Sequence, residues 1–290
     1  MSGNVSVFLA NLDAELELGD PGYVRSSRMA ASIRARAASL PHLVVLDARD
    51  VPSDAVVVGG DAWCMTPSAR AVLDALGVEA RAPAVEVLRR VNHRSFAASL
   101  GPRLPGAVFC TSVADCTRAF ARAPDRPWLL KRALGFAGRM RKRVVPSAMD
   151  AASRTWLAAS MDGHGAGLMV EPFVAIVAEF SLHGRLLADG AVQRGAPVRF
   201  GTDADGAFAS ARRATPGELA PGELRALDDA FARCASALRA ADYFGPFGLD
   251  AFRWRDDAGV RLFHPLSELN ARYTMAWWVG MGECERGEAT

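Results

Sequence analysis

The stretch WLLKRALGFAGRMRKRVV, residues 128–145, decides the fold that we predict for this chain. Short apolar runs begin and end it, a pattern that predicts two strands joined by a loop. Gly135 and Gly138 lie in that loop, where glycine lets the backbone curve closely around a bound group. Lys131 is in the first strand, and a lysine before a glycine-bearing loop can bind phosphate oxygens. The stretch therefore predicts a phosphate-binding hairpin, although a solvated basic hairpin fits it equally well.

The protein has only two lysines, Lys131 and Lys142, and both lie in this stretch. Arginine supplies all the other basic residues. A lysine retained in such an arginine-rich chain indicates a need for its compact ammonium group, which the planar guanidinium of arginine replaces poorly.

The composition is that of an ordinary globular protein. The chain has 290 residues, of which 50% are hydrophobic and 23% are charged. Its net charge of +2 gives no global field toward nucleic acid or anionic lipid, so we expect neither as a partner. No apolar run approaches the roughly 20 residues of a membrane span. The five cysteines lack the spacing of zinc or redox motifs, and we see no signal-peptide pattern, so we expect a cytoplasmic protein with reduced thiols.

The first 83 residues alternate between short apolar runs and helix-forming segments. The apolar runs are bounded by turn signals, which predicts buried strands. An alanine-rich segment and one that begins with proline predict helices. The predicted strands are residues 5–10, 43–46 and 55–58, and the predicted helices are residues 25–40 and 67–76. This alternation predicts a small parallel α/β domain, which we assign to residues 1–83.

The rest of the chain divides into two predicted units. Residues 84–166 hold the hairpin, together with predicted helices at 84–100, 112–123 and 150–161 and a strand at 108–111. In residues 167–290 the pattern changes to strands around one long amphipathic helix. These strands are residues 168–174, 177–187, 191–200, 249–254 and 260–263, and the helix is residues 220–241. We therefore predict a mixed α/β chain of three domains.

Acidic and amide side chains gather near the end of the sequence. Asp250 lies in the first strand of the last predicted hairpin, and Glu268 and Asn270 follow the second. Residues two apart on extended backbone face the same side, so these side chains could share one ion with Asp250. Their hard oxygen atoms suit Mg²⁺, which usually keeps phosphate and water in its remaining positions. Arg272 falls on the same side if the extension continues, but it could instead be a simple ion-pair partner at a strand end.

Taken in order, these motifs resemble those of the ATP-grasp superfamily, which includes D-alanine–D-alanine ligase and biotin carboxylase. The resemblance runs from about residue 91 onward, and residues 1–83 resemble the family's preceding domain. It implies an α/β preATP-grasp domain followed by a two-subdomain ATP-grasp fold. In that fold Lys131 would bind the α- and β-phosphates of ATP, under a loop that contains Gly135 and Gly138. Arg94 is nearest to the place of a second family lysine, and Met140 stands where the loop usually has glycine.

The resemblance also implies an adenosine site in the strands that follow. The segment from Glu171 through Phe173 to Val174 resembles the linker whose backbone and acidic residue hold adenine. Glu179 lies near the position of the family's ribose-binding glutamate.

The implied chemistry is that of a ligase that depends on ATP and Mg²⁺. Asp250, Glu268 and Asn270 would bind magnesium, and Arg272 and Lys131 would act in catalysis on the transferring phosphate. A small-molecule carboxylate would be activated as an acylphosphate and attacked by an amine or thiol. A small-molecule kinase, or a degenerate nucleotide-binding protein without ligase activity, stays an alternative, and homodimer formation is left open.

Overall fold

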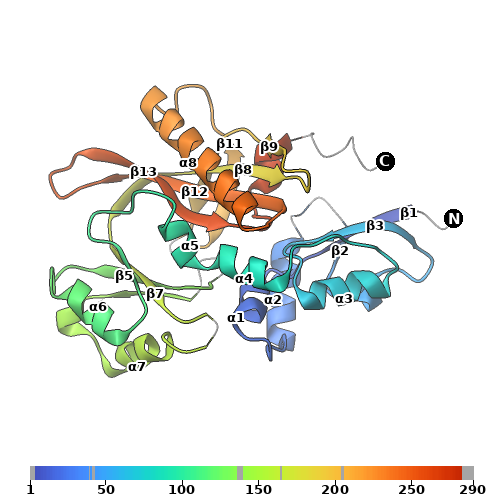
Figure 1. Ribbon diagram of the computed structural model, residues 1–290, viewed down its shortest axis with the longest axis horizontal. Coiled ribbons are helices and arrows are strands. Elements are labelled where there is room, and N and C mark those ends of the chain that lie inside the picture. The colour runs from blue at the N-terminus through green and yellow to red at the C-terminus, as the bar shows by residue number, and fades with distance from the viewer. Residues whose placement is uncertain are drawn as a thin grey trace.

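The computed structural model describes residues 4–38, 40, 43–135, 140–163, 165–203 and 206–282, and three sheets organise this part of the chain. Figure 1 shows the N-terminal unit in blue on the right and the central sheet with α6 (Val113–Phe120) and α7 (Ala151–Ala159) at the lower left. The C-terminal sheet lies above them and is covered by α8 (Pro221–Ala240). The predicted mixed α/β class is confirmed.

The N-terminal unit is built on a three-stranded parallel sheet with the order β2-β1-β3, as the alternation predicted. Its elements are β1 (Asn4–Leu9), α1 (Ala14–Gly19), α2 (Ser27–Ala37), β2 (Leu43–Val45), the 3₁₀ turn η1 (Ala48–Asp50), β3 (Val56–Ala62) and α3 (Pro67–Ala75). Thr66 caps α3 by accepting a hydrogen bond from the backbone of Ala69, and Pro67 fills the first turn. The sequence does not predict α1, a six-residue helix without a side-chain cap.

The central unit contains a four-stranded antiparallel sheet with the order β4-β7-β5-β6. Its strands are β4 (Val108–Cys110), β5 (Trp128–Arg132), β6 (Arg141–Val144) and β7 (Leu168–Pro172), and the 3₁₀ turn η2 (Pro146–Ala148) precedes α7. The predicted hairpin of residues 128–145 is confirmed as β5 and β6. Because β7 pairs with β4 and β5, this sheet continues past residue 166, where we placed a domain boundary from the sequence.

The C-terminal unit contains a six-stranded sheet with the order β11-β10-β8-β12-β13, to which β9 adds beside β8. Its strands are β8 (Ala175–Leu186), β9 (Val192–Arg194), β10 (Val198–Thr202), β11 (Phe208–Arg213), β12 (Gly245–Arg255) and β13 (Arg261–Asn270). The single predicted strand at residues 191–200 is wrong, because Gly195-Ala196-Pro197 divides it into β9 and β10. The last hairpin is longer than predicted, and β13 includes Glu268 and Asn270.

The predicted helix at residues 84–100 is in fact two helices, α4 (Val85–Asn92) and α5 (Arg94–Ala98). The chain breaks at His93, whose backbone is extended and whose ring nitrogen caps α5. Just before the break, the Asn92 side chain accepts a hydrogen bond from the backbone of Ala271 at 2.9 Å. Just after it, the backbone N–H of Arg94 donates to the carbonyl of Ala133 at 2.9 Å. The break therefore ties the end of β5 to the end of β13.

Two hydrophobic cores hold the central and C-terminal sheets in place. The larger core joins the N-terminal unit to the C-terminal sheet, since Phe8 and Ile33 belong to the same buried cluster as Phe247 and Leu227. The central sheet has a separate core around Trp128. The short helix α9 (Trp277–Met281) packs on the C-terminal sheet. Within the described residues, no helix is both long and apolar enough to cross a membrane.

Candidate active site

Two strands of the C-terminal sheet, β12 and β13, bring together the predicted metal ligands. Asp250 of β12 lies directly opposite Glu268 of β13, and the next position along this face pairs Gly248 with Asn270. The amide nitrogen of Asn270 lies 3.5 Å from a carboxylate oxygen of Asp250. Directly paired positions and positions two apart share a face of a sheet, so all three side chains occupy one face.

Burial and mutual repulsion act on the two carboxylates of this face. Burial, and then the negative charges of Glu268 and Glu179, raise the pKa of Asp250 to about 7. Burial also opposes ionisation of Glu268, but the cations Arg94 and Lys131 outweigh it and lower the pKa of that carboxyl. The charges of Arg272 and Lys131 also act on Asp250, but they do not offset its burial and the neighbouring acids.

The same face carries further buried polar atoms. Ser181 and His183 of β8 are paired with Asp250 and Gly248, respectively. Among the described residues, three buried side chains have polar atoms without a hydrogen-bond partner: the hydroxyls of Ser181 and Thr274 and both ring nitrogens of His183. Burial lowers the pKa of His183 to about 3, so its imidazole is neutral at physiological pH.

Cations from the central unit face this acidic site. Lys131 of β5 forms an ion pair with Glu171 of β7 at 2.7 Å, and both side chains are largely buried. Arg94, at the start of α5, forms an ion pair with Glu268 at 2.8 Å and donates from its Nε to the carbonyl of Arg132 at 2.9 Å. The ion pair of Arg94 with Glu268 thus joins the central unit to the C-terminal sheet, and the charge of Lys131 also acts on Glu268.

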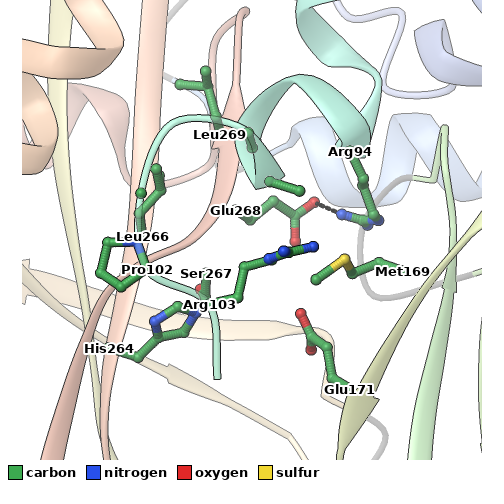
Figure 2. A pocket seen from close by; sticks show the side chains of 13 residues that line it. Arg94, Pro102, Arg103, Met169, Glu171, His264, Leu266, Ser267, Glu268 and Leu269 are labelled. Carbon is green, nitrogen blue, oxygen red and sulfur yellow. Dashed lines mark ion pairs between the residues drawn. The ribbon is translucent and has the colours of Figure 1, made fainter. Parts of the chain in front are cut away.

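Figure 2 shows a pocket that is lined by Arg94, Glu268 and Glu171, with Glu268 above and Glu171 below. Arg103, from the loop after α5, extends its guanidinium between the two carboxylates. The cavity is about 20 Å³, which is room for about one water molecule. This cavity is too small to hold a molecule much larger than water. No pattern in the sequence points to Arg103.

The other residues predicted to bind the nucleotide lie on the central sheet and in the segment that follows it, as far as the described residues show. Gly135 is buried after the end of β5, whereas Gly138 lies outside the described residues. The backbone N–H of Phe173 donates to the carbonyl of Pro127. The guanidinium of Arg143 lies 4.0 Å from the centre of the Phe173 ring. Val174 packs beside the small cluster of Leu104, Phe252 and Trp254.

Glu179 lies on β8, on the same face as Ser181. Its carboxylate accepts a hydrogen bond from the hydroxyl of Thr202 at 2.9 Å. Burial raises the pKa of Glu179, although this hydrogen bond and the charge of Arg199 oppose the effect.

Arg272 lies beyond the end of β13 and turns toward the N-terminal unit. Its Nε donates to the carboxylate of Glu15 in α1, and its guanidinium lies 5.6 Å from the centre of the Trp63 ring. Its charge still acts on both Asp250 and Glu268. No pattern in the sequence points to Glu15, which is 257 residues away from Arg272.

Solved structures with the same arrangement of sheets identify the fold. The N5-carboxyaminoimidazole synthetase of Staphylococcus aureus, solved with ADP, is similar over 95% of this chain and 72% of its own, with a TM-score of 0.53 and 9% identity. D-Alanyl-alanine synthetase A of Vibrio cholerae is similar over 93% and 89%, with a TM-score of 0.51 and 12% identity. The chain has the ATP-grasp fold.

A third ATP-grasp structure matches nearly end to end. D-Cycloserine synthetase is similar over 97% of this chain and 96% of its own, with a TM-score of 0.52 and 14% identity. No family model matches the sequence, and no curated protein matches it either. The ATP-grasp fold is therefore established by structure, and within it the central and C-terminal sheets carry the groups described above.

Proposed function

We propose that this protein binds ATP with Mg²⁺ between its central and C-terminal sheets and uses it to join a carboxylate to an amine or thiol. The observation that carries the proposal is the meeting of Lys131 and Arg94 with the acidic face of Asp250, Glu268 and Asn270. Phosphoryl transfer needs mainly alignment and neutralisation of charge, and this arrangement offers both. The likeness to synthetases, one of them solved with ADP, supports the same activity.

The donor set of the acidic face fits a magnesium ion. Two carboxylates and one amide oxygen are hard ligands of the type that Mg²⁺ prefers. Burial and neighbouring acids favour the protonated form of Asp250. A bound dication would favour the ionised form instead, because its positive charge would offset both effects. When bound, magnesium would supply positive charge that neutralises the phosphate groups of ATP.

The side chains around this site have separable tasks in the proposed reaction. Lys131 and Arg94 would exchange their present carboxylate partners for phosphate oxygens of ATP. Arg272, held in place by Glu15, would neutralise charge on the phosphoryl group as it passes to the substrate carboxylate. The acylphosphate formed in this way would then lose phosphate to the amine or thiol. Exclusion of water from the narrow cleft would protect the acylphosphate from hydrolysis.

A matched pair of lysine variants tests the proposal. Lys142 lies in the same sheet as Lys131, but it is paired opposite the core residue Leu130 and donates to Ser153 instead of the acidic site. We expect Lys131→Ala to weaken transition-state stabilisation by about 2–4 kcal/mol, and Lys142→Ala to leave it nearly unchanged. Equal effects of the two substitutions would contradict the proposed site.

The readout is ADP release with Mg²⁺ and ATP, for carboxylic acids crossed with amines and thiols. A ligase releases ADP and free phosphate only when both substrates are present. A small-molecule kinase would instead leave a phosphorylated product without free phosphate. Magnesium-dependent ATP binding without any substrate-dependent ADP release would contradict the ligase.

A further inference from the structure

Arg103 lies in the loop that joins α5 to β4, and its side chain points into the pocket of Figure 2. Its guanidinium extends between the carboxylates of Glu268 and Glu171. Both carboxylates line this pocket, together with Arg94. Arg103 itself is exposed, so its charge reaches the two acids from the solvent side.

Packing on both sides holds the loop in place. Leu104, the residue after Arg103, is 5% exposed and belongs to a small hydrophobic cluster with Phe252 and Trp254 of β12. Before the loop, Nε of Arg233 in α8 donates to the carbonyl of Leu100 at 3.0 Å. The loop also contains two prolines, which restrict its backbone. The backbone is therefore held, and the long arginine side chain is the part that can move.

Two other cations that face these carboxylates already have partners. Lys131 forms an ion pair with Glu171 at 2.7 Å, and Arg94 forms one with Glu268 at 2.8 Å. Arg103 forms no ion pair and no hydrogen bond with any part of the chain that the structure describes. It is thus a positive charge beside two carboxylates that are both already paired.

The proposed function, on which this inference rests, removes both of those partners. Arg94 leaves Glu268 for the phosphate oxygens of ATP, and magnesium would then supply positive charge beside Glu268. Lys131 likewise leaves Glu171, which is not among the residues that we assign to the metal. The amino group of a bound adenine can donate a hydrogen bond to Glu171 but brings no charge. Glu171 is 5% exposed, and a buried carboxylate without a cation is strongly destabilising, so the nucleotide complex needs another cation there.

We propose that Arg103 is this cation: when Lys131 moves to ATP, the guanidinium of Arg103 turns and pairs with Glu171. A guanidinium suits this exchange because it can form two parallel hydrogen bonds with a carboxylate. Arg103 is then a positioning residue, which favours nucleotide binding through Glu171 and not by contact with the phosphates.

Calorimetric titration of the full-length protein with Mg²⁺ and a non-hydrolysable ATP analogue tests the proposal. We expect Arg103→Ala to weaken binding at least tenfold, and Arg103→Lys, which keeps the charge, to weaken it less. The melting temperature of the nucleotide-free Arg103→Ala variant should be unchanged, because no ion pair among the described residues is lost.

Arg154→Ala is the matched control. Arg154 is an exposed arginine of α7 that does not line the pocket, so its removal measures the loss of one general positive charge. This substitution should change the affinity for the analogue less than twofold. Equal affinities of Arg103→Ala and Arg154→Ala would overturn the inference.

A double-mutant cycle separates action through Glu171 from direct contact with the nucleotide. In a Glu171→Gln background there is no buried charge for Arg103 to neutralise. Arg103→Ala should therefore change the affinity less than twofold in that background. The same tenfold loss in both backgrounds would show that Arg103 acts without Glu171, and the inference would be wrong.

A crystal structure of the wild type with the same analogue gives a readout that needs no variant. We expect the guanidinium of Arg103 within hydrogen-bond distance of the Glu171 carboxylate. Lys131 bound to phosphate while Glu171 makes no contact with Arg103 would contradict the proposed exchange.

The proposed function fails on a different measurement. If the wild type does not bind the analogue with Mg²⁺, the ligase proposal and this inference fall together. If it does bind, and Lys131→Ala loses affinity while Arg103→Ala does not, the ligase stands and the role proposed for Arg103 is wrong.

Discussion

The buried ion pair between Glu15 and Arg272 gives the sharpest prediction about stability. It joins the N-terminal unit to the end of β13, and its side chains are only 3% and 7% exposed, respectively. Glu15→Ala would leave the guanidinium of Arg272 buried without its carboxylate partner. Breaking a buried pair by removing one partner typically costs about 3–5 kcal/mol. We therefore expect Glu15→Ala to lower the free energy of unfolding by an amount in that range.

The matched control removes both charges. Burial raises the pKa of Glu15 in spite of the neighbouring arginine, which indicates that the pair does not fully repay the cost of burying the acid. The double variant Glu15→Met with Arg272→Leu should therefore lie within about 1–2 kcal/mol of the wild type in stability. It should also lack ligase activity, because Arg272 is gone.

Urea unfolding followed by tryptophan fluorescence measures the free energy of unfolding of the single and the double variant. Trp63 reports on this region because its ring lies close to the guanidinium of Arg272. The shared core of the N-terminal unit and the C-terminal sheet should make these two parts unfold together. A loss below about 1 kcal/mol in Glu15→Ala would refute the reasoning. So would a double variant as unstable as the single one.

Two further predictions concern His183 and Met140. Burial lowers the pKa of His183 from 6.5 to about 3, so below pH 6.5 the unfolded chain takes up a proton that the folded chain excludes. Its contribution to stability should therefore fall by about 2 kcal/mol between pH 7 and pH 5, and urea unfolding of His183→Phe should show a correspondingly smaller slope with pH. Met140 has a φ of 60°, a left-handed conformation that glycine adopts freely and β-branched residues avoid. In thermal unfolding, Met140→Val should be less stable than the wild type by about 1–3 kcal/mol, whereas Met140→Gly should be no less stable. Equal effects of the two substitutions would contradict backbone strain at this position.

Local patterns in the sequence predicted the parts of the fold that local chemistry determines. The parallel N-terminal sheet follows from apolar runs that alternate with helix-forming segments, and the hairpin of β5 and β6 follows from two apolar runs around glycines. The sequence placed Asp250 and Glu268 in or next to the last hairpin, but it did not predict that they pair, because the register that the turn sets at Arg255 and Arg261 shifts between Asp250 and Phe252.

Tertiary contacts determine the parts that the sequence did not predict. The chain breaks at His93 because Asn92 bonds to Ala271, a partner 179 residues away. Glu15 lies on a six-residue helix whose N-cap residue, Asp13, makes no side-chain capping hydrogen bond, and its partner Arg272 is near the other end of the chain. Arg103 occupies the cleft from a loop, and the sequence pattern of a loop does not reveal where its side chains point.

The central claim is that ATP and Mg²⁺ bind where Lys131 of the central sheet faces Asp250, Glu268 and Asn270 of the C-terminal sheet. A crystal structure of the protein with Mg²⁺ and a non-hydrolysable ATP analogue tests it most directly. We predict a triphosphate between these groups, with Lys131 and Arg94 released from Glu171 and Glu268 and bound to phosphate oxygens. A nucleotide bound elsewhere, or phosphates out of reach of Lys131 and Glu268, would contradict the account.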